Sequence, residues 1–128
     1  MNIKLNHTIV QSKDKHAAAD FFSGLFGVPR AKPFGPFLGI EVGNEVTLDF
    51  MDADGDGIQS QHYAFLVGEE EFDRIFGRIK ERGLKHWADP DQTREGQINR
   101  HDGGRGVYFE DPSGHLLEII TRPYGSGS

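Results

Sequence analysis

The sequence contains no cysteine, which excludes disulfide bonds, thiolate metal ligands and cysteine nucleophiles. Any metal ion must therefore be held by nitrogen and oxygen ligands. The chain also lacks an apolar run approaching the ~18 residues that span a bilayer, and residues 1–10 lack the basic and then apolar profile of a signal peptide. We expect a cytoplasmic protein that does not bind a membrane.

Clusters of basic residues are also missing. The chain has 14 Lys and Arg against 20 Asp and Glu, which gives a net charge of -6, and no Lys/Arg stripe stands out. This charge balance disfavours a nucleic-acid partner, and small molecules are the expected partners. At 128 residues the chain is long enough for one domain with its own core.

The hydrophobic periodicity predicts the same order of elements twice: a strand, a helix and three strands. Ser12 is the predicted N-cap of the first helix, and Gly27 and Gly83 end the two helices. The predicted elements are a strand at 5–11, a helix at 13–27, strands at 31–34, 37–42 and 45–51, a strand at 61–67, a helix at 69–82, and strands at 85–87, 107–110 and 115–121. The expected fold class is α+β, a single domain of two βαβββ modules at approximately 1–57 and 58–128.

Spacing supports an internal repeat. His62 follows His7 by nearly the same number of residues as Gly83 follows Gly27. In the last strands "LDF" at 48–50 aligns with "LEI" at 117–119, and the polar loop 89–106 accounts for the extra residues of the second module. Duplication therefore makes His7 equivalent to His62 and Asp49 equivalent to Glu118.

Glu118 lies in a strand whose two faces are otherwise apolar, just after the turn sequence Asp-Pro-Ser-Gly at 111–114. A buried carboxylate needs a partner. One alternative is an ion pair with an arginine such as Arg122. The other is a metal ion, because two histidines and two carboxylates from equivalent strands can converge on one cleft.

Imidazole and carboxylate ligands suit Fe(II), Mn(II), Zn(II), Ni(II) or Co(II), and two histidines with one carboxylate form the facial arrangement of non-haem iron oxygenases. A single strand histidine is more often a hydrogen-bonded core residue. The repeat relation between His7 and His62 favours the metal hypothesis for the pair.

The segments "LNHTIV", "SQHYAFLV" and "VYFEDPSGHLLEII" resemble the vicinal oxygen chelate superfamily, which includes glyoxalase I, extradiol dioxygenases, fosfomycin-resistance thiol transferases and bleomycin-binding proteins. The resemblance covers residues 2–124. It implies that His7, His62 and Glu118 are metal ligands. It also implies a glyoxalase-like fold in which two βαβββ modules form a curled mixed sheet around a metal cleft, in a homodimer whose sites can draw on both chains.

Within the superfamily, the chain lacks the serine-rich loop and the arginine-bearing C-terminal tail of fosfomycin-type enzymes, whereas bleomycin binders lack the metal ligands present here. Glyoxalase I has four ligands, and Asp49 stands where that enzyme has a glutamate. The segments "TLDF", "REGQINRHDGGRGVYFEDP" and "IITRPYG" are similar to the subgroup around the oxidative-rearrangement enzyme of chartreusin biosynthesis.

Further side chains are candidates for the same cleft. We expect Asp49 to act as a substrate-side base or a weak ligand and Tyr108 to line the cleft. The loop 89–106 is either a lid or a solvated connection, and Arg100 is a candidate anchor for anionic or phenolic oxygens. Other candidate anchors are Arg94, His101 and Arg105, and the expected apolar walls are Phe34, Phe37, Phe50, Met51 and Trp87.

These features lead to the hypothesis of an Fe(II)-dependent oxygenase of antibiotic biosynthesis. It would act on an aromatic, polyketide-derived substrate chelated through two adjacent oxygens, with catalytic roles for Asp49, Tyr108 and Arg100. A need for reduced flavin as reductant stays open. The alternatives are a non-redox lyase or isomerase of glyoxalase type and a drug-sequestering resistance protein.

Overall fold

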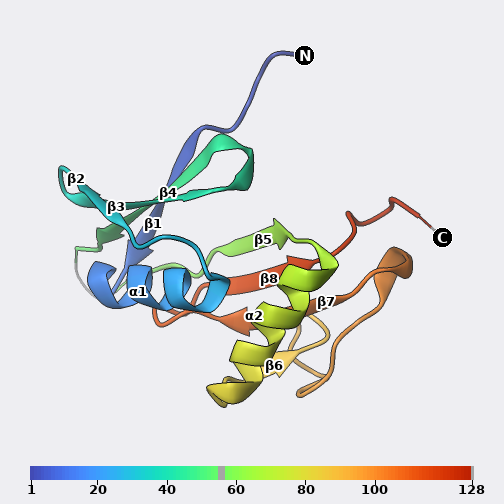
Figure 1. The fold of residues 1–128 in the computed structure, drawn as a ribbon. Helices are drawn as coiled ribbons and strands as arrows, with labels where there is room; N and C mark the ends of the chain where they lie inside the picture. The colour runs from blue at the N-terminus through green and yellow to red at the C-terminus, as the bar shows by residue number, and fades with distance from the viewer. Residues whose placement is uncertain (55–56, 128) are drawn as a thin grey trace. The chain divides into compact units, whose positions relative to one another are not determined.

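The computed structural model describes residues 1–54 and 57–127, and the chain divides into two compact units, Met1–Gln59 and Ser60–Ser128. Each unit contains a strand, a helix and three further strands, so the predicted α+β class with two βαβββ modules is confirmed. The strands form two separate four-stranded mixed sheets and do not close into a barrel (Figure 1).

The first unit places one helix on one face of its sheet. Its elements are β1 (His7–Ser12), α1 (Lys15–Phe26), β2 (Lys32–Phe34), β3 (Phe37–Val42), the short 3-10 helix η1 (Gly43–Glu45) and β4 (Val46–Asp52), and the strand order is β1-β4-β3-β2. Alternate residues of β1, β3 and β4 are buried toward α1. The opposite face of this sheet carries the less buried residues, and residues 1–6 extend beyond the end of β1 (Figure 1).

The second unit repeats this arrangement with β5 (His62–Leu66), α2 (Glu69–Glu81), β6 (His86–Trp87), the 3-10 helix η2 (His101–Gly103), β7 (Gly106–Glu110) and β8 (Leu116–Ile120). Its strand order is β5-β8-β7-β6, and α2 lies across one face of the sheet (Figure 1). The predicted hairpin turn joins β7 to β8. The Asp111 carboxylate accepts hydrogen bonds from the Ser113 and His115 amides at 2.9 and 2.8 Å, and Gly114 closes the turn with a φ of 88°.

Strand pairing reproduces the repeat that the spacing predicts. β1 runs parallel to β4 with Ile9 opposite Asp49, and β5 runs parallel to β8 with Ala64 opposite Glu118. In each edge strand the histidine lies two residues before the residue opposite the carboxylate. Because side chains two residues apart share a face, each histidine projects from the same face as the carboxylate of its own unit.

The prediction of Ser12 as the helix N-cap is wrong. Ser12 is the last residue of β1, fully buried, and its hydroxyl donates to the Val10 carbonyl. The cap is Asp14, whose carboxylate accepts from the amides of His16 and Ala17 at 2.9 and 3.2 Å. Register decides this, because the parallel pairing of β1 with β4 continues through Ser12 and delays the helix.

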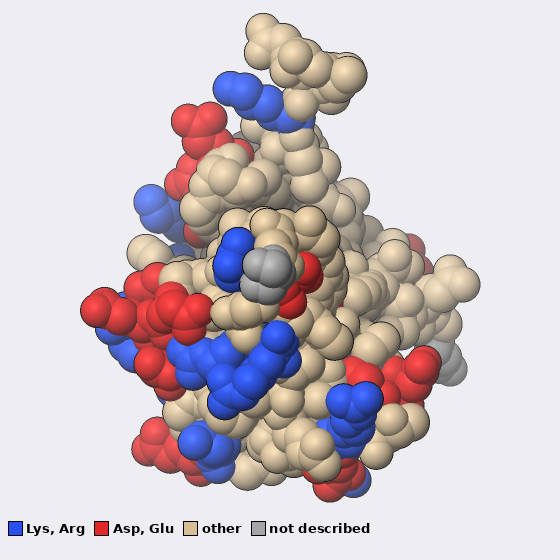
Figure 2. Space-filling view, turned by 90° about the vertical axis from the view of Figure 1, so that its right-hand side faces the viewer, with Lys and Arg blue, Asp and Glu red and all other residues tan. Residues whose placement is uncertain are grey.

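The surface shows two features that bear on partners. No helix in residues 1–54 or 57–127 is long and apolar enough to cross a membrane. On the face drawn in Figure 2, Lys and Arg side chains lie interspersed with Asp and Glu. The apolar residues that remain most exposed on elements of the first unit are Ile9 and Phe34, and Leu66 of β5 is exposed in the second.

Candidate active site

Glu118 is the most unusual polar residue of the second unit. It lies in the middle of β8, and only 1 % of its surface is exposed. The ring nitrogen Nε2 of His62 lies 2.9 Å from one carboxylate oxygen, and the Tyr124 hydroxyl donates to the other. Arg122, the alternative partner, instead directs its guanidinium to the Ser126 carbonyl at 3.4 Å. The buried carboxylate is therefore held by an imidazole and a phenol.

Two tyrosines complete this network. Tyr108 on β7 stands directly opposite Glu118, and its hydroxyl lies 3.1 Å from that of Tyr124. Either hydroxyl can be the donor in this contact. The His62 side chain is 47 % exposed, with its ring 5.8 Å from that of Tyr108. One side of the imidazole is thus open while the carboxylate is covered.

The pKa of the Tyr108 phenol is raised well above its ordinary value of 10.0, first by burial and then by its hydrogen bond with Glu118. The unfolded chain therefore loses this proton first as the pH rises past 10.0, so alkaline pH destabilises the fold. We expect Tyr108→Phe to reduce the loss of unfolding free energy between neutral and alkaline pH, measured by urea denaturation. Burial also raises the pKa of the Tyr63 phenol. Tyr63→Phe is therefore the matched control, because it measures how much of the alkaline destabilisation comes from this second phenol. Equal pH dependence in wild type and Tyr108→Phe would contradict the burial of this phenol.

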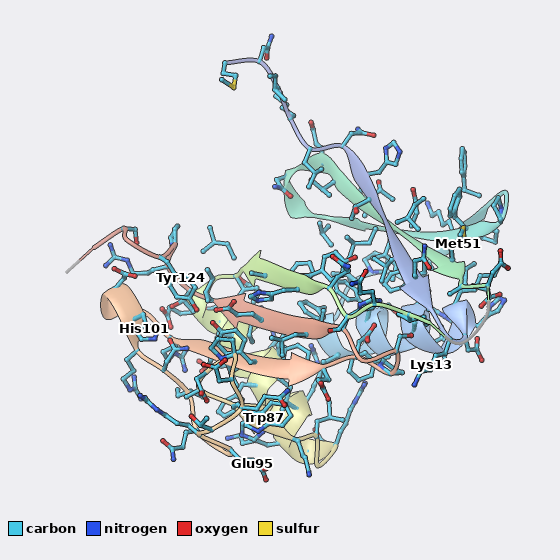
Figure 3. All side chains as sticks on the ribbon, turned by 180° about the vertical axis from the view of Figure 1, so that it is seen from behind. Lys13, Met51, Trp87, Glu95, His101 and Tyr124 are labelled. Atoms are coloured by element: carbon cyan, nitrogen blue, oxygen red, sulfur yellow. The ribbon has the colours of Figure 1, made fainter. Side chains whose placement is uncertain are left out.

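A role for Tyr124 was not predictable from the sequence, because this residue lies in an irregular segment after β8 that has no periodicity. The fold brings it to Glu118 through the loop before β7. The Asp102 carboxylate accepts from the Gly125 amide at 2.9 Å, and the His101 ring meets the Tyr124 ring edge to face at 5.8 Å (Figure 3). The loop therefore positions the segment that carries the phenol.

The same loop is fastened at both ends. The Asp89 carboxylate accepts from Thr93 and from the Arg94 amide, and the Thr93 hydroxyl is the main cause of the lowered pKa of Asp89. The Asn99 side chain donates to the Ala88 carbonyl at 2.9 Å, and Asn99 pairs with Gly106 of β7. These contacts tie the loop to the segment that follows β6 and to the start of β7.

Two of the predicted anion anchors, Arg105 and Arg100, have different surroundings in the structure. The Arg105 guanidinium donates to Glu69 and Asp73 of α2 at 2.9 and 2.8 Å and lies over the Phe72 ring. It therefore joins the loop to the helix and is not available as an anion anchor. Arg100 precedes η2 and is exposed.

His7 and Asp49 lie in the first unit, on the open face of its sheet. His7 is exposed and its Nδ1 lies 2.8 Å from the Asn6 side-chain oxygen, whereas Asp49 is half-buried. Both line a hollow of about 920 Å³. The prediction that Phe50 forms an apolar wall is wrong, since strand alternation turns Phe50 into the core beside Phe22. Trp87 is buried in the second unit and stands opposite Tyr108, so it lies on the sheet face that carries Glu118, and its role as a wall stays a prediction.

The donor set fits a divalent ion. A buried carboxylate with an imidazole at 2.9 Å supplies one oxygen and one nitrogen ligand, and a second exposed imidazole lies on the equivalent strand of the first unit. Within either unit, the described residues contain no group of three or more His, Asp or Glu side chains arranged around a metal position.

Comparison with known proteins identifies the family. Residues 4–119 match the Glyoxalase/Bleomycin resistance protein/Dioxygenase superfamily. The chain belongs to this superfamily. It is 59 % identical to the solved structure of Oxidase ChaP-H1, covering 97 % of this chain and 99 % of that one with a TM-score of 0.94. It is 56 % identical to Oxidase ChaP-H2 over the full length of both chains, with a TM-score of 0.96. The predicted resemblance, including the chartreusin-type subgroup, is confirmed.

More distant members share the fold. Lactoylglutathione lyase from Agrobacterium tumefaciens is 20 % identical, covers 91 % of this chain and 92 % of that one, and has a TM-score of 0.67, so the glyoxalase-like fold is confirmed. The metallothiol transferase FosB of Shouchella clausii is 38 % identical over 60 residues, which are 47 % of this chain and 37 % of that protein. The chain thus matches little more than a third of the length of this curated relative.

Proposed function

We propose that the protein is a divalent-metal-dependent oxygenase, with Fe(II) as the native metal, that acts on an aromatic substrate chelated through two adjacent oxygens. The observation that carries the proposal is the buried Glu118 carboxylate with the His62 imidazole against it. The high identity to two proteins named oxidases extends over nearly the full chain, and it supports a reaction that uses oxygen. The proposed ligands are His7, His62 and Glu118.

When bound, the metal would supply a Lewis-acid centre for two adjacent substrate oxygens together with redox chemistry toward dioxygen. His62 would hold the metal through Nε2, and Glu118 would hold it through the carboxylate oxygen that faces this nitrogen. Tyr124 holds the far oxygen of Glu118 and thereby orients the near one. In this proposal the protonated Tyr108 would donate to a substrate oxygen, Asp49 would accept a substrate proton, and Arg100 would hold an anionic or phenolic oxygen.

We further propose that each site is assembled in a homodimer, with His7 supplied by one chain and His62 and Glu118 by the other. Both sheets end in an edge strand that carries a ligand candidate, β1 and β5. Ile9 and Phe34 in the first unit and Leu66 in the second are exposed apolar side chains, which favour a protein interface.

Mixed dimers test this arrangement. His7→Ala and Glu118→Ala homodimers should each bind no Fe(II) under anaerobic loading. After dissociation and equimolar reassembly, half of the dimers are mixed and each contains one intact site, so metal content should return to about a quarter of the wild-type value.

The matched control mixes His62→Ala with Glu118→Ala. Because His62 and Glu118 of one site come from the same chain, every site of a mixed dimer then lacks one of these two ligands, and no metal binding should return. Equal recovery in the two mixtures, or none in the first, would refute the shared site. Failure of the wild-type protein itself to bind Fe(II) would refute the metal-dependent oxygenase.

A second candidate is a non-redox lyase or isomerase of glyoxalase type. It is favoured by the equivalent register of Asp49 and Glu118 in their strands. If Asp49 were the fourth ligand, fewer positions on the metal would stay open for substrate, which suits proton transfer next to a carbonyl. Oxygen uptake on addition of an aromatic substrate separates the two, because only the oxygenase consumes dioxygen.

A further inference from the structure

The two sheets differ at one position that the repeat makes equivalent. In the second sheet Tyr108 of β7 stands opposite Glu118 of β8. In the first sheet Gly39 of β3 stands opposite Asp49 of β4. The first module therefore has a glycine where the second has a large phenol.

No side chain rises from the sheet at Gly39, and the side chains of Asp49 and Thr47 lie close to the position that its Cβ would take. A Cβ added to Gly39 would lie 3.3 Å from the Asp49 carboxylate oxygen and 3.4 Å from the Thr47 methyl group, both from the neighbouring strand β4. The hollow of about 920 Å³ lies over this position and is lined by residues on both sides of it, including His7, Lys32 and Phe34. A hollow of this size is in the range that holds a small organic ligand.

The chemistry of the hollow suits a flat, mostly apolar ligand with oxygen at its rim. At Gly39 the strand presents backbone with no side chain, so a planar ring can lie on the sheet surface. The Phe34 ring is 73 % exposed on β2, and the Pro33 and Val42 side chains also line the hollow. Lys32 and Arg30 bring cations to the same space, while Asp49 brings an acceptor. Polar groups of both signs thus surround an apolar floor.

We propose that this hollow receives the distal rings of a polycyclic aromatic substrate and that Gly39 is the residue that sets how many fused rings fit. The proposal rests on the proposed function, because adjacent oxygens at one end of the substrate would be held at the metal near His7. A larger residue at position 39 fills the floor of the hollow and must displace the Asp49 and Thr47 side chains, but the atoms nearest to its Cβ belong to none of the proposed ligands His7, His62 and Glu118. Ring number, and not chelation, is the property that Gly39 controls.

The test compares two probes that chelate through the same two adjacent hydroxyls, catechol with one ring and alizarin with three. Their dissociation constants are measured by absorbance titration on Zn(II)-loaded wild type, Gly39→Leu and Gly39→Ala. Gly43→Leu is the matched control, because a Cβ there meets no atom within 4 Å and Gly43 does not line the hollow. Gly39→Leu should weaken alizarin by about tenfold or more while catechol changes by less than about threefold.

Gly39→Ala adds a single carbon and keeps the experiment decisive if the leucine variant does not fold, and it should weaken alizarin more than catechol. Equal weakening of both probes, or an unchanged affinity for alizarin in either Gly39 variant, would overturn the proposal. If the wild-type protein binds each probe as tightly without Zn(II) as with it, the chelating function is contradicted. The ratio of alizarin to catechol affinity in the Gly39 variants would still test the role of Gly39.

Discussion

Glu118→Gln is expected to weaken metal binding by at least about 100-fold while the fold persists. Glutamine keeps the size of the side chain and removes its charge, so the proposed site loses its anionic ligand. The unfolding free energy of the metal-free variant should be equal to or above that of the wild type, because a buried carboxylate costs desolvation that a neutral amide largely avoids. Metal content after anaerobic Fe(II) loading and urea denaturation of the metal-free protein measure the two effects.

The matched control is Asp49→Asn, which makes the same chemical change at the equivalent position of the first unit. We expect this variant to retain its metal, since Asp49 is proposed as a substrate-side base. If Glu118→Gln retains metal, or if it unfolds the metal-free protein, Glu118 is a structural residue paired with His62 and Tyr124. Loss of metal in both variants would make Asp49 a ligand and would favour the glyoxalase-type alternative.

Phe109→Ala is expected to lower the unfolding free energy by about 3–5 kcal/mol. Phe109 lies on the α2 side of β7, fully buried and opposite Leu117 of β8 in the strand register. Truncation removes apolar contact area and leaves a cavity that neighbouring strands cannot close without breaking their pairing. Urea denaturation with circular dichroism at a fixed protein concentration gives the value.

Glu81→Ala is the control for Phe109→Ala, because Glu81 is exposed at the end of α2. A surface truncation of this kind is expected to change stability by less than about 0.5 kcal/mol. A cost below about 1 kcal/mol for Phe109→Ala would contradict its place in the core.

Much of the fold follows from local sequence chemistry. The helices were predictable from apolar periodicity and from the glycines that end them, since Gly27 and Gly83 both adopt the left-handed conformation. The hairpin after β7 was predictable because the Asp111 side chain and Gly114 satisfy the turn by themselves. The start of the first helix was not predictable, because Ser12 and Asp14 are both good caps and only the pairing of β1 with β4 chooses between them.

The candidate site was also predictable only in part. The repeat in the sequence was enough to select His7, His62, Asp49 and Glu118, because duplicated strands keep equivalent residues on equivalent faces. The sequence left an ion pair with Arg122 and a metal ion as alternatives for Glu118, and it could not show that His62 lies against this carboxylate. Two strands far apart in the chain must first align, and β5 places His62 against Glu118 by its parallel register with β8.

By itself the sequence determined the order of the elements, the duplication and the residue types able to hold a metal, since these depend on spacing along the chain. Tertiary structure alone decided which groups meet: Tyr124 contacts Glu118, Arg105 binds acidic residues of α2, and Gly39 lines a hollow at the position that Tyr108 occupies in the other sheet. The physical reason is that such contacts join residues from separate elements. Their partners are set by strand register and loop closure, which no local pattern encodes.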